Sequence, residues 1–541
     1  MNGREEVVER RGWMALTLLS VAGAAVINVW RIQFGVDFTD EAFYAALATM
    51  LERGVRPLVD EWNLAQFAAL PLIPIVKLTG MNGVILLLRI ANVVMRAAAA
   101  MAVAWSLREW MSRSIAVLAA LFTFAMVPYD LPSVSYNTVG ALALTAGCFI
   151  ALGSSPRRHI AAGALHAIAA WAYPPLAIAA GTAFVFGAIR DRRFIVRYIG
   201  GAAIASLPWI ATILINGVGA FRHVLGFAGS MVSPRPFGQR VRLAAQLFLA
   251  HPPYLLLAAA IVVLALVALR RVDAARWALP IVPVAAFLEQ FPVLYATLGF
   301  TSWLALLGLV ASCFLWRDEC LRPLITGAII PGVIAGTTTA ISSSNAAVAF
   351  GVGSLPAAQA MVAMLVILSG RRVIAFAVAS LCWFIPSVEQ YWPTAVYRDD
   401  DVWRLSARVP SGPYAHIRTS PAKLAWLLQI QSDIARIEKP GGRIFFFYDF
   451  PAGYLMSRSR SASPTTWTMP IATARASDRL PGLFAERGWP DVMVRLRRIP
   501  FTRTIANRNA YLPADPLNAA FRDYRVAIAR DDYDILILAG R

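Results

Sequence analysis

The chain has 541 residues, of which 58% are hydrophobic, and its mean hydropathy is +0.59. These values exclude an ordinary soluble globular protein, in which about half of the residues are apolar. The formal charge of +19 does not by itself indicate nucleic-acid binding. Much of the arginine lies in short loops between apolar runs, where basic residues set topology and contact lipid headgroups. The composition therefore predicts a membrane protein.

Apolar runs recur from Met14 to about Ser387 and then stop. A span needs roughly 20 apolar residues, so residues 1–387 have room for about thirteen spans. No AxA-type cleavage signal follows the basic N-terminus, so we interpret the first run as an uncleaved span that ends near Ile32. Basic loops alternate along this region, and the positive-inside rule predicts a cytoplasmic N-terminus and an outer C-terminus.

Two longer loops are predicted on the outer side, at residues 33–81 and 217–251. The first has an acidic bias, which suits the outer face. Residues 64–78 are apolar, but a span there would put two basic loops on the wrong side, so we expect a re-entrant or interfacial helix. Residues 159–189 must cross twice, as two short spans broken at Pro174-Pro175.

The composition changes after Ser387, and residues 388–541 are rich in Arg, Asp, Pro and Ser. A helix is predicted at 420–439, and strands at Arg443–Tyr448 and Asp534–Leu538. We therefore expect a mainly α chain. A polytopic transmembrane domain (1–387) would be followed by a small α/β domain outside the membrane (388–541).

The segment DFTDEAFYAALATMLERG (37–54) carries the strongest chemical signal. Thr39 is expected to cap a helix there. Helical spacing puts Asp40 and Tyr44 on the face toward the membrane domain, and Glu41 on a face toward water. A carboxylate against an apolar surface at a membrane interface is costly, so Asp40 is a candidate general base. The other interpretation is that both acids only stabilise the helix N-terminus.

With its Asp-Glu pair, its Tyr and an amphipathic helix after the first span, the chain resembles the GT-C glycosyltransferases. The nearest branch holds the protein O-mannosyltransferases and the lipid A aminoarabinose transferase. Further segments of this chain resemble the family in the same order: GVRPLVDEWNLAQFAALPL (54–72), AWAYPPLAI (170–178), SSSNAAVAFGVGSLPA (342–357), FFFYDFPAGYLMSRSR (445–460) and DYRVAIARDDYDILIL (523–538).

The resemblance implies transfer of a sugar from a polyprenyl-phosphate carrier to a glycan, lipid or protein acceptor at the outer face of the cytoplasmic membrane. Asp40 would take the proton of the acceptor, Glu41 would support it, and the configuration would invert. The resemblance implies no cofactor with certainty beyond the carrier lipid, and it leaves a divalent cation open. Some members use a divalent cation near the first-loop acid. Asp37, Asp40 and Glu41 would hold one only with help from distant residues, so we predict no metal site.

Cationic side chains are needed to stabilise the negative charge of the leaving phosphate. The candidates are Lys77, Arg235, Arg240 and Arg242. The family pattern has a basic residue before the Pro-Leu pair, where this chain has Gln66. Candidate substrate contacts are Tyr44, Asp130, Tyr136, Asn137 and Asn345. Headgroup contact explains the cations, and helix capping or turn formation explains the other residues, without any ligand.

A transporter or flippase is the main alternative from another class, because many spans with buried charge also suit a substrate pathway. Transporters usually show two related halves, and no such internal symmetry is visible here. An envelope polymer ligase and a non-catalytic GT-C-like assembly protein remain as further alternatives.

Overall fold

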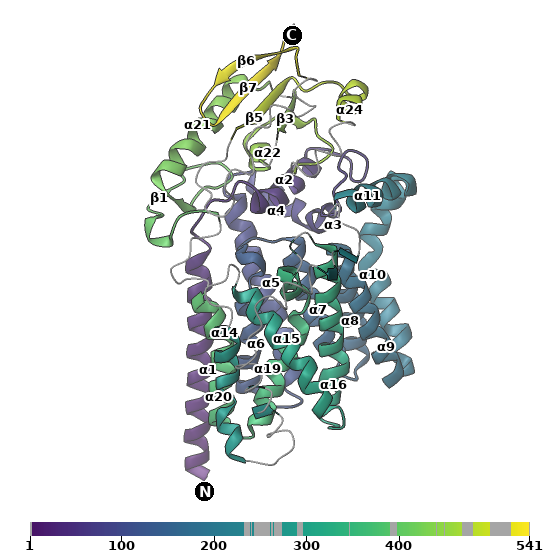
Figure 1. The fold of residues 1–541 in the computed structure, drawn as a ribbon, viewed down its shortest axis with the longest axis vertical. Helices are drawn as coiled ribbons and strands as arrows, with labels where there is room; N and C mark the ends of the chain where they lie inside the picture. The colour runs from purple at the N-terminus through teal and green to yellow at the C-terminus, as the bar shows by residue number, and fades with distance from the viewer. Residues whose placement is uncertain are drawn as a thin grey trace.

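The computed structural model describes residues 3–231, 273–288, 296–343, 347–389, 398–439, 441–447, 450–467, 480–497 and 521–539. It also describes residues 238, 239, 241, 242, 260, 263, 264 and 345. The N-terminus lies at one end of an elongated helical bundle, and the C-terminus lies beyond the other end (Figure 1).

Helices account for most of the chain up to Glu389. The first set is α1 (Gly3–Arg31), α2 (Asp40–Glu52), α3 (Gln66–Ala69), η1 (Leu70–Leu72), α4 (Ile73–Thr79), α5 (Val84–Leu107), α6 (Arg113–Ala125), η2 (Pro128–Asp130), α7 (Tyr136–Ile150), α8 (Pro156–Ala172), η3 (Pro174–Leu176), α9 (Ala177–Arg190), α10 (Arg192–Asn216) and α11 (Val218–Met231). The second set is η4 (Asp273–Ala278), α14 (Ile281–Leu288), α15 (Ala296–Leu315), α16 (Arg322–Leu324), η5 (Ile325–Ile329), α17 (Ile330–Ser342), α18 (Ala347–Gly353), α19 (Leu355–Ser369) and α20 (Arg372–Glu389).

Several of these helices have the length and surface of membrane spans. Within the described residues, five are long and apolar enough to cross a bilayer: Gly12–Arg31, Val84–Leu107, Arg192–Asn216, Leu298–Leu315 and Arg322–Ser342. Large apolar side chains cover their outer surfaces, and Leu19 on α1 and Val196 on α10 are 68% and 77% exposed. Such a surface is costly in water and suits lipid. The predicted fold class, a polytopic helical domain followed by a small sheet region, is confirmed.

The predicted break at the double proline is present. Helix α8 ends at Ala172, η3 contains Pro174 and Pro175, and α9 begins at Ala177. Proline lacks the N–H group that a continuing helix needs, and it disfavours helical conformation in the residue before it. Tyr173, in an extended conformation between the two helices, therefore projects from the break.

Residues 64–78 do not form one helix. Helices α3, η1 and α4 follow one another here, and they lie with α2 between the bundle and the C-terminal sheet (Figure 1). Gln66 begins α3, and its side-chain amide is fully buried among backbone groups of residues 58–63. The segment therefore supports the boundary of the bundle and does not continue through it.

The C-terminal α/β region, residues 398–539, contains a small mixed sheet. Its strands are β3 (Arg443–Phe447), β4 (Arg460–Ser461), β5 (Val492–Leu496), β6 (Tyr524–Ala529) and β7 (Tyr533–Leu538), in the order β4-β3-β5-β7-β6. Strands β4, β3 and β5 are parallel, whereas β5-β7 and β7-β6 pair antiparallel. The other elements are η6 (Val402–Arg404), β1 (Ala407–Arg408), β2 (Arg418–Thr419), α21 (Pro421–Ile437), α22 (Ala452–Met456) and α24 (Leu480–Arg487). The predicted helix and both predicted strands are therefore present.

Strand β3 shows why the sheet is joined to the first loop. Its residues point alternately to two sides. Ile444 and Phe446 belong to a core shared with α2 and α21, whereas Phe445 and Phe447 belong to a second core shared with α24 and the loop around Trp62. Both faces of the strand are buried, which explains its uninterrupted apolar sequence.

Helix α2 is consequently buried on all sides, which corrects the predicted amphipathic pattern. Every residue from Glu41 to Leu51 is buried, because the bundle covers one side of the helix and the C-terminal region covers the other. Periodicity along α2 alone does not reveal the second covering layer, since that layer comes from residues some 400 positions later in the sequence.

Candidate active site at the start of helix α2

Asp37, not Thr39, caps helix α2. Its Oδ1 accepts hydrogen bonds from the Thr39 backbone N–H at 3.0 Å and the Thr39 hydroxyl at 2.7 Å. Its Oδ2 accepts from the backbone N–H of Glu41 at 2.7 Å. The Thr39 side chain makes no capping bond of its own, so the predicted cap is wrong. The carboxylate is the better acceptor for the N–H groups exposed at a helix N-terminus.

Glu41 pairs with Arg89 of α5 inside the bundle. The Arg89 Nε and Nη2 atoms each lie 2.6 Å from one Glu41 carboxylate oxygen, and the Ser133 hydroxyl donates to Oε1 of Glu41. The remaining Arg89 N–H groups donate to the carbonyl oxygens of Ile32, Phe34 and Gly35 at 2.6–2.9 Å. All five guanidinium donors are therefore used.

The expected orientation of the two acids is thus reversed. Glu41 is fully buried, whereas the Asp40 side chain is 20% exposed. Glu41 faces inward because the buried Arg89 lies on that side of α2, and a buried charge needs a partner of opposite charge. We assign Glu41 a positioning role, since its network joins α2, α5 and the segments around Phe34 and Ser133.

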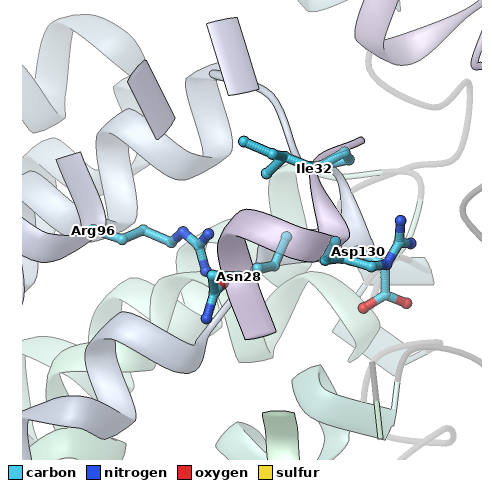
Figure 2. A pocket seen from close by; sticks show the side chains of 7 residues that line it. Asn28, Ile32, Arg96 and Asp130 are labelled. Atoms are coloured by element: carbon cyan, nitrogen blue, oxygen red, sulfur yellow. The ribbon is translucent and has the colours of Figure 1, made fainter. Parts of the chain in front are cut away.

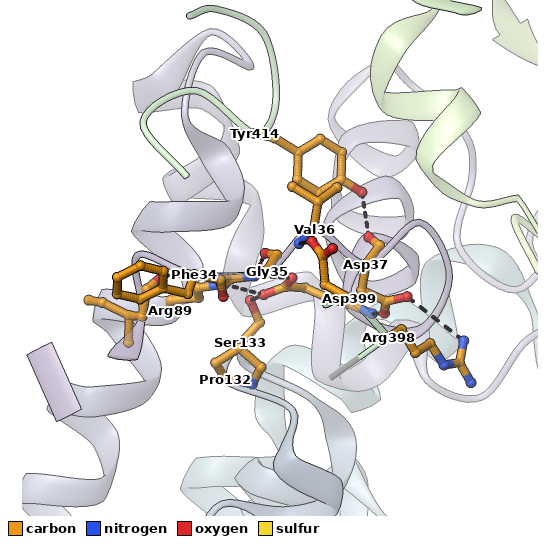
Figure 3. A network of polar contacts seen from close by, with 12 residues as sticks. Phe34, Gly35, Val36, Asp37, Arg89, Pro132, Ser133, Arg398, Asp399 and Tyr414 are labelled. Atoms are coloured by element: carbon orange, nitrogen blue, oxygen red, sulfur yellow. Dashed lines mark hydrogen bonds and ion pairs between the residues drawn. The ribbon is translucent and has the colours of Figure 1, made fainter. Parts of the chain in front are cut away.

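Asp40 meets a different arginine. Its Oδ2 lies 2.6 Å from Nη2 of Arg398, and Nη1 of the same guanidinium lies 3.8 Å from Asp37 Oδ1. Arg398 belongs to the C-terminal region, and Figure 3 shows it reaching toward the first turn of α2 from the side opposite Arg89. The Asp40 carboxylate therefore lies where the bundle, the first loop and the C-terminal region meet.

A second buried cluster holds the backbone around Arg398 against the first loop. The Asp399 carboxylate accepts from the Val36 N–H at 2.8 Å and the Thr419 hydroxyl at 2.7 Å. The Lys423 ammonium is fully buried, lies 3.6 Å from Asp399, and donates to the Val36 carbonyl and, at 2.7 Å, to the Arg398 carbonyl. Burial lowers the pKa of Lys423, and the nearby Asp399 opposes that change.

Aromatic side chains border Asp40 on the bundle side. Tyr44 lies one helical turn after Asp40, and its ring makes an edge contact with Tyr136 of α7 at 5.8 Å. Tyr136 in turn contacts Tyr173, the residue at the double-proline break, at 4.9 Å. Burial raises the pKa of Tyr44 well above its ordinary value, and Tyr136 and Asp40 raise it further. These hydroxyls are therefore neutral hydrogen-bonding groups beside the carboxylate.

A small polar cavity lies next to this network. Asn28, Arg31, Arg96 and Asp130 line it, together with apolar residues that include Ile32 (Figure 2). Its volume of about 20 Å³ is enough for a water molecule and far too small for a sugar. Asp130 lines this cavity, and its predicted contact with substrate stays a prediction.

The structure brings only some of the predicted site residues together. Asp40, Tyr44 and Tyr136 form one cluster, and Asn137 is buried next to Tyr136 at the start of α7. Lys77 is exposed near the end of α4, and Asn345 is exposed in the turn before α18. Arg242 is exposed, while Arg235 and Arg240 lie outside the described residues. The ligand roles of all these residues stay predictions.

The acids of the first loop do not fit a metal centre. Asp37 accepts three hydrogen bonds, Glu41 is held by Arg89, and Asp40 pairs with Arg398. Within the described residues, no group of three His, Cys, Asp or Glu side chains could hold a metal ion.

No protein-family model matches the chain, and no curated protein matches it. The solved structures that are similar to it include two of ArnT. ArnT from Cupriavidus metallidurans in the apo state is 15% identical over 98% of this chain and 100% of that chain, with a TM-score of 0.47. ArnT bound to undecaprenyl phosphate is 16% identical over 98% of this chain and 99% of that chain, with a TM-score of 0.43. Both belong to the GT-C group that the sequence resembles.

The sequence did carry one signal for a missed residue. Arg89 and Arg96 interrupt the apolar run of α5 seven positions apart, and an arginine inside a span is a functional suspect. Arg398, Asp399 and Lys423 gave no such signal, because their partners in the first loop lie more than 350 positions away in the sequence.

Proposed function

We propose that this chain is a membrane glycosyltransferase. It moves a sugar from a polyprenyl-phosphate donor to an acceptor at the outer face of the cytoplasmic membrane. The observation that carries the proposal is the position of Asp40. This carboxylate is 20% exposed, lies at the end of an apolar bundle beside two tyrosines, and faces a guanidinium. Such a group can take a proton and still be reached by substrates.

The position suits a substrate that is part lipid and part sugar. The outer surface of the bundle is apolar and accommodates a polyprenyl chain, whereas the loop and sheet above it are polar. A phosphate at the boundary between the two would lie at the level of α2. The C-terminal region covers that level, which would exclude water from the reacting atoms.

The proposed reaction is a single displacement at the anomeric carbon. The acceptor hydroxyl or amine gives its proton to Asp40 as its oxygen or nitrogen forms the bond to the anomeric carbon. The bond from that carbon to the phosphate oxygen breaks, and its electron pair stays on the lipid phosphate. Attack from the side opposite the leaving group inverts the configuration. Tyr44 and Tyr136 offer neutral hydroxyls for sugar contacts.

Glu41 takes no proton in this scheme. Its bidentate pair with Arg89 fixes the first turn of α2 against α5. Asp40 lies in the same turn and is therefore held in place as well. The rigid support keeps the neighbouring base within hydrogen-bonding reach of an acceptor.

The test is Asp40→Asn, with Glu52→Gln as the matched control. Glu52 is an exposed acid on the same helix. Purified variants are supplied with lipid-linked sugars, beginning with undecaprenyl-phosphate donors, and transfer and thermal unfolding are measured. We expect Asp40→Asn to lower turnover by about 10²–10⁴-fold while unfolding is little changed, and Glu52→Gln to behave as the parent. Full turnover in Asp40→Asn would remove Asp40 as the base.

A further inference from the structure

Arg398 has a backbone conformation that arginine rarely adopts. Its φ angle is +53°, in the left-handed region that is costly for residues with a side chain. Such strain persists only when the surroundings hold it. Here the buried Lys423 binds the Arg398 carbonyl, and the buried Asp399 binds Val36 and Thr419. The chain therefore maintains a strained turn that points this side chain at the first turn of α2.

The side chain of Arg398 is 11% exposed, and its guanidinium forms an ion pair with the Asp40 carboxylate. Its Nη2 lies 2.6 Å from Asp40 Oδ2, and its Nη1 lies 3.8 Å from Asp37 Oδ1. A guanidinium prefers a planar, bidentate acceptor, and a phosphate offers one. The ion pair with Asp40 can therefore be exchanged for a phosphate without unfolding α2.

No contact within the described residues joins Gln66 or Lys77 to Asp40. Gln66 occupies the place of the family's basic residue, and its amide is committed to the Leu58 N–H and the carbonyls of Glu61 and Asn63. Lys77 is exposed on α4. Arg398 is the described cation that an ion pair joins directly to the proposed base.

We infer that Arg398 binds the phosphate of the lipid donor, and that its ion pair with Asp40 is the donor-free arrangement of the site. The inference rests on the proposed function and adds to it the ligand of the leaving group. When the donor binds, its phosphate replaces the Asp40 carboxylate as the partner of the Arg398 guanidinium. The Asp40 oxygen then becomes available to the acceptor. In the transfer step the phosphate oxygen gains the electron pair of the broken bond, next to Arg398, while the proton goes to Asp40.

Binding without turnover tests the inference. Undecaprenyl phosphate and undecaprenol, which lacks the phosphate, are titrated into the purified full chain in nanodiscs. The variants are Arg398→Gln, Arg398→Lys and Asp40→Asn. Arg404→Gln is the matched control, because Arg404 is an exposed arginine of the same segment that pairs with Asp400 at 3.8 Å.

We expect Arg398→Gln to weaken the binding of undecaprenyl phosphate by about tenfold to a hundredfold and to leave the binding of undecaprenol unchanged. Arg398→Lys recovers part of the loss, and Arg404→Gln behaves as the parent. Asp40→Asn binds the phosphate lipid more tightly than the parent, because the competing carboxylate is gone. This last result is opposite to the one expected if Asp40 were merely structural.

Equal weakening of both lipids, or no weakening in Arg398→Gln, overturns the inference. The two proposals also fail separately. Sugar transfer with parental lipid binding in Arg398→Gln would refute the phosphate role and leave the transferase intact. Arg398-dependent binding in a protein that transfers no sugar would keep the phosphate site and refute the transferase.

Discussion

Two arginines approach the first turn of α2 from opposite sides, and each pairs with one of two adjacent acids. Arg89 comes from inside the bundle and holds Glu41 through two contacts of 2.6 Å, with both side chains almost fully buried. Arg398 comes from the C-terminal region and lies 2.6 Å from the Asp40 carboxylate, with side chains 11% and 20% exposed.

The difference in burial between the two pairs indicates a structural role for Glu41–Arg89 and a functional role for Asp40–Arg398. Every donor of Arg89 has a partner, so exchanging Glu41 for a substrate would leave a buried charge unsatisfied. The Arg398 pair is partly open to solvent and can change partners at smaller cost. Adjacent acids on one helix can thus have different roles, set by what covers each side of the helix.

The largest effect is expected where the buried pair is broken. Glu41→Gln should lower the free energy of unfolding by about 3–5 kcal/mol, because it leaves Arg89 charged and unmatched in the interior. Asp40→Asn, the same chemical change one residue earlier, should lower the free energy of unfolding by less than Glu41→Gln does, because the Asp40 side chain is 20% exposed. Thermal unfolding of the two variants in one detergent measures the contrast.

A double variant separates charge from packing. Glu41→Leu combined with Arg89→Met removes both charges, so it should unfold at a higher temperature than Glu41→Gln. Equal unfolding temperatures for Glu41→Gln and Asp40→Asn would mean that the two pairs do not differ in the way their burial indicates.

The fold was largely predictable because its signals are local. Apolar runs predict spans, Pro174-Pro175 predicts a break, and the apolar run that begins at Arg443 predicts a strand. Each depends on residues within a few positions of one another. The existence and class of these elements therefore follow from the sequence with no knowledge of tertiary contacts.

The site was only partly predictable because its contacts are long-range. Asp40 and its tyrosine neighbour lie one turn apart and can be read from the sequence. The orientation of Glu41 depends on Arg89, 48 positions later, and the partner of Asp40 is Arg398. The sequence pattern of a helix predicts one solvent-exposed face, and this prediction is wrong when a segment far away in the sequence covers that face.

Glu61 is a buried carboxyl that lacks an arginine partner among the described residues, and it sharpens the comparison. It accepts hydrogen bonds from the N–H groups of Asn63 at 2.9 Å and Thr466 at 3.3 Å, and Tyr454 lies nearby. Burial raises its pKa to about 8, although these hydrogen bonds oppose the rise. Without a guanidinium, burial favours the protonated form.

The sign of the pH effect follows from this shift. The folded state holds the proton up to about pH 8, whereas the unfolded chain releases it near 4.5, so the stabilisation is complete below pH 4.5 and is lost as the pH rises to 8. The slope should be about 1.4 kcal/mol per pH unit between those values. Glu61→Gln should unfold at a temperature that varies less over this window. A variant with the parental pH profile would contradict the assignment to Glu61.

The smallest effect is expected at Lys77, one of the four cations that the sequence alone offered for the donor phosphate. Its side chain is exposed on α4, and no ion pair within the described residues joins it to Asp40 or Asp37. An exposed ammonium near a membrane contacts headgroups and contributes little to a specific site. We therefore expect Lys77→Gln to leave undecaprenyl-phosphate binding within about twofold of the parent, less than the change from Arg398→Gln. If Lys77→Gln instead removed phosphate-dependent binding and Arg398→Gln did not, the donor would approach α2 from the α4 side. The Asp40–Arg398 pair would then be a structural contact like the one between Glu41 and Arg89.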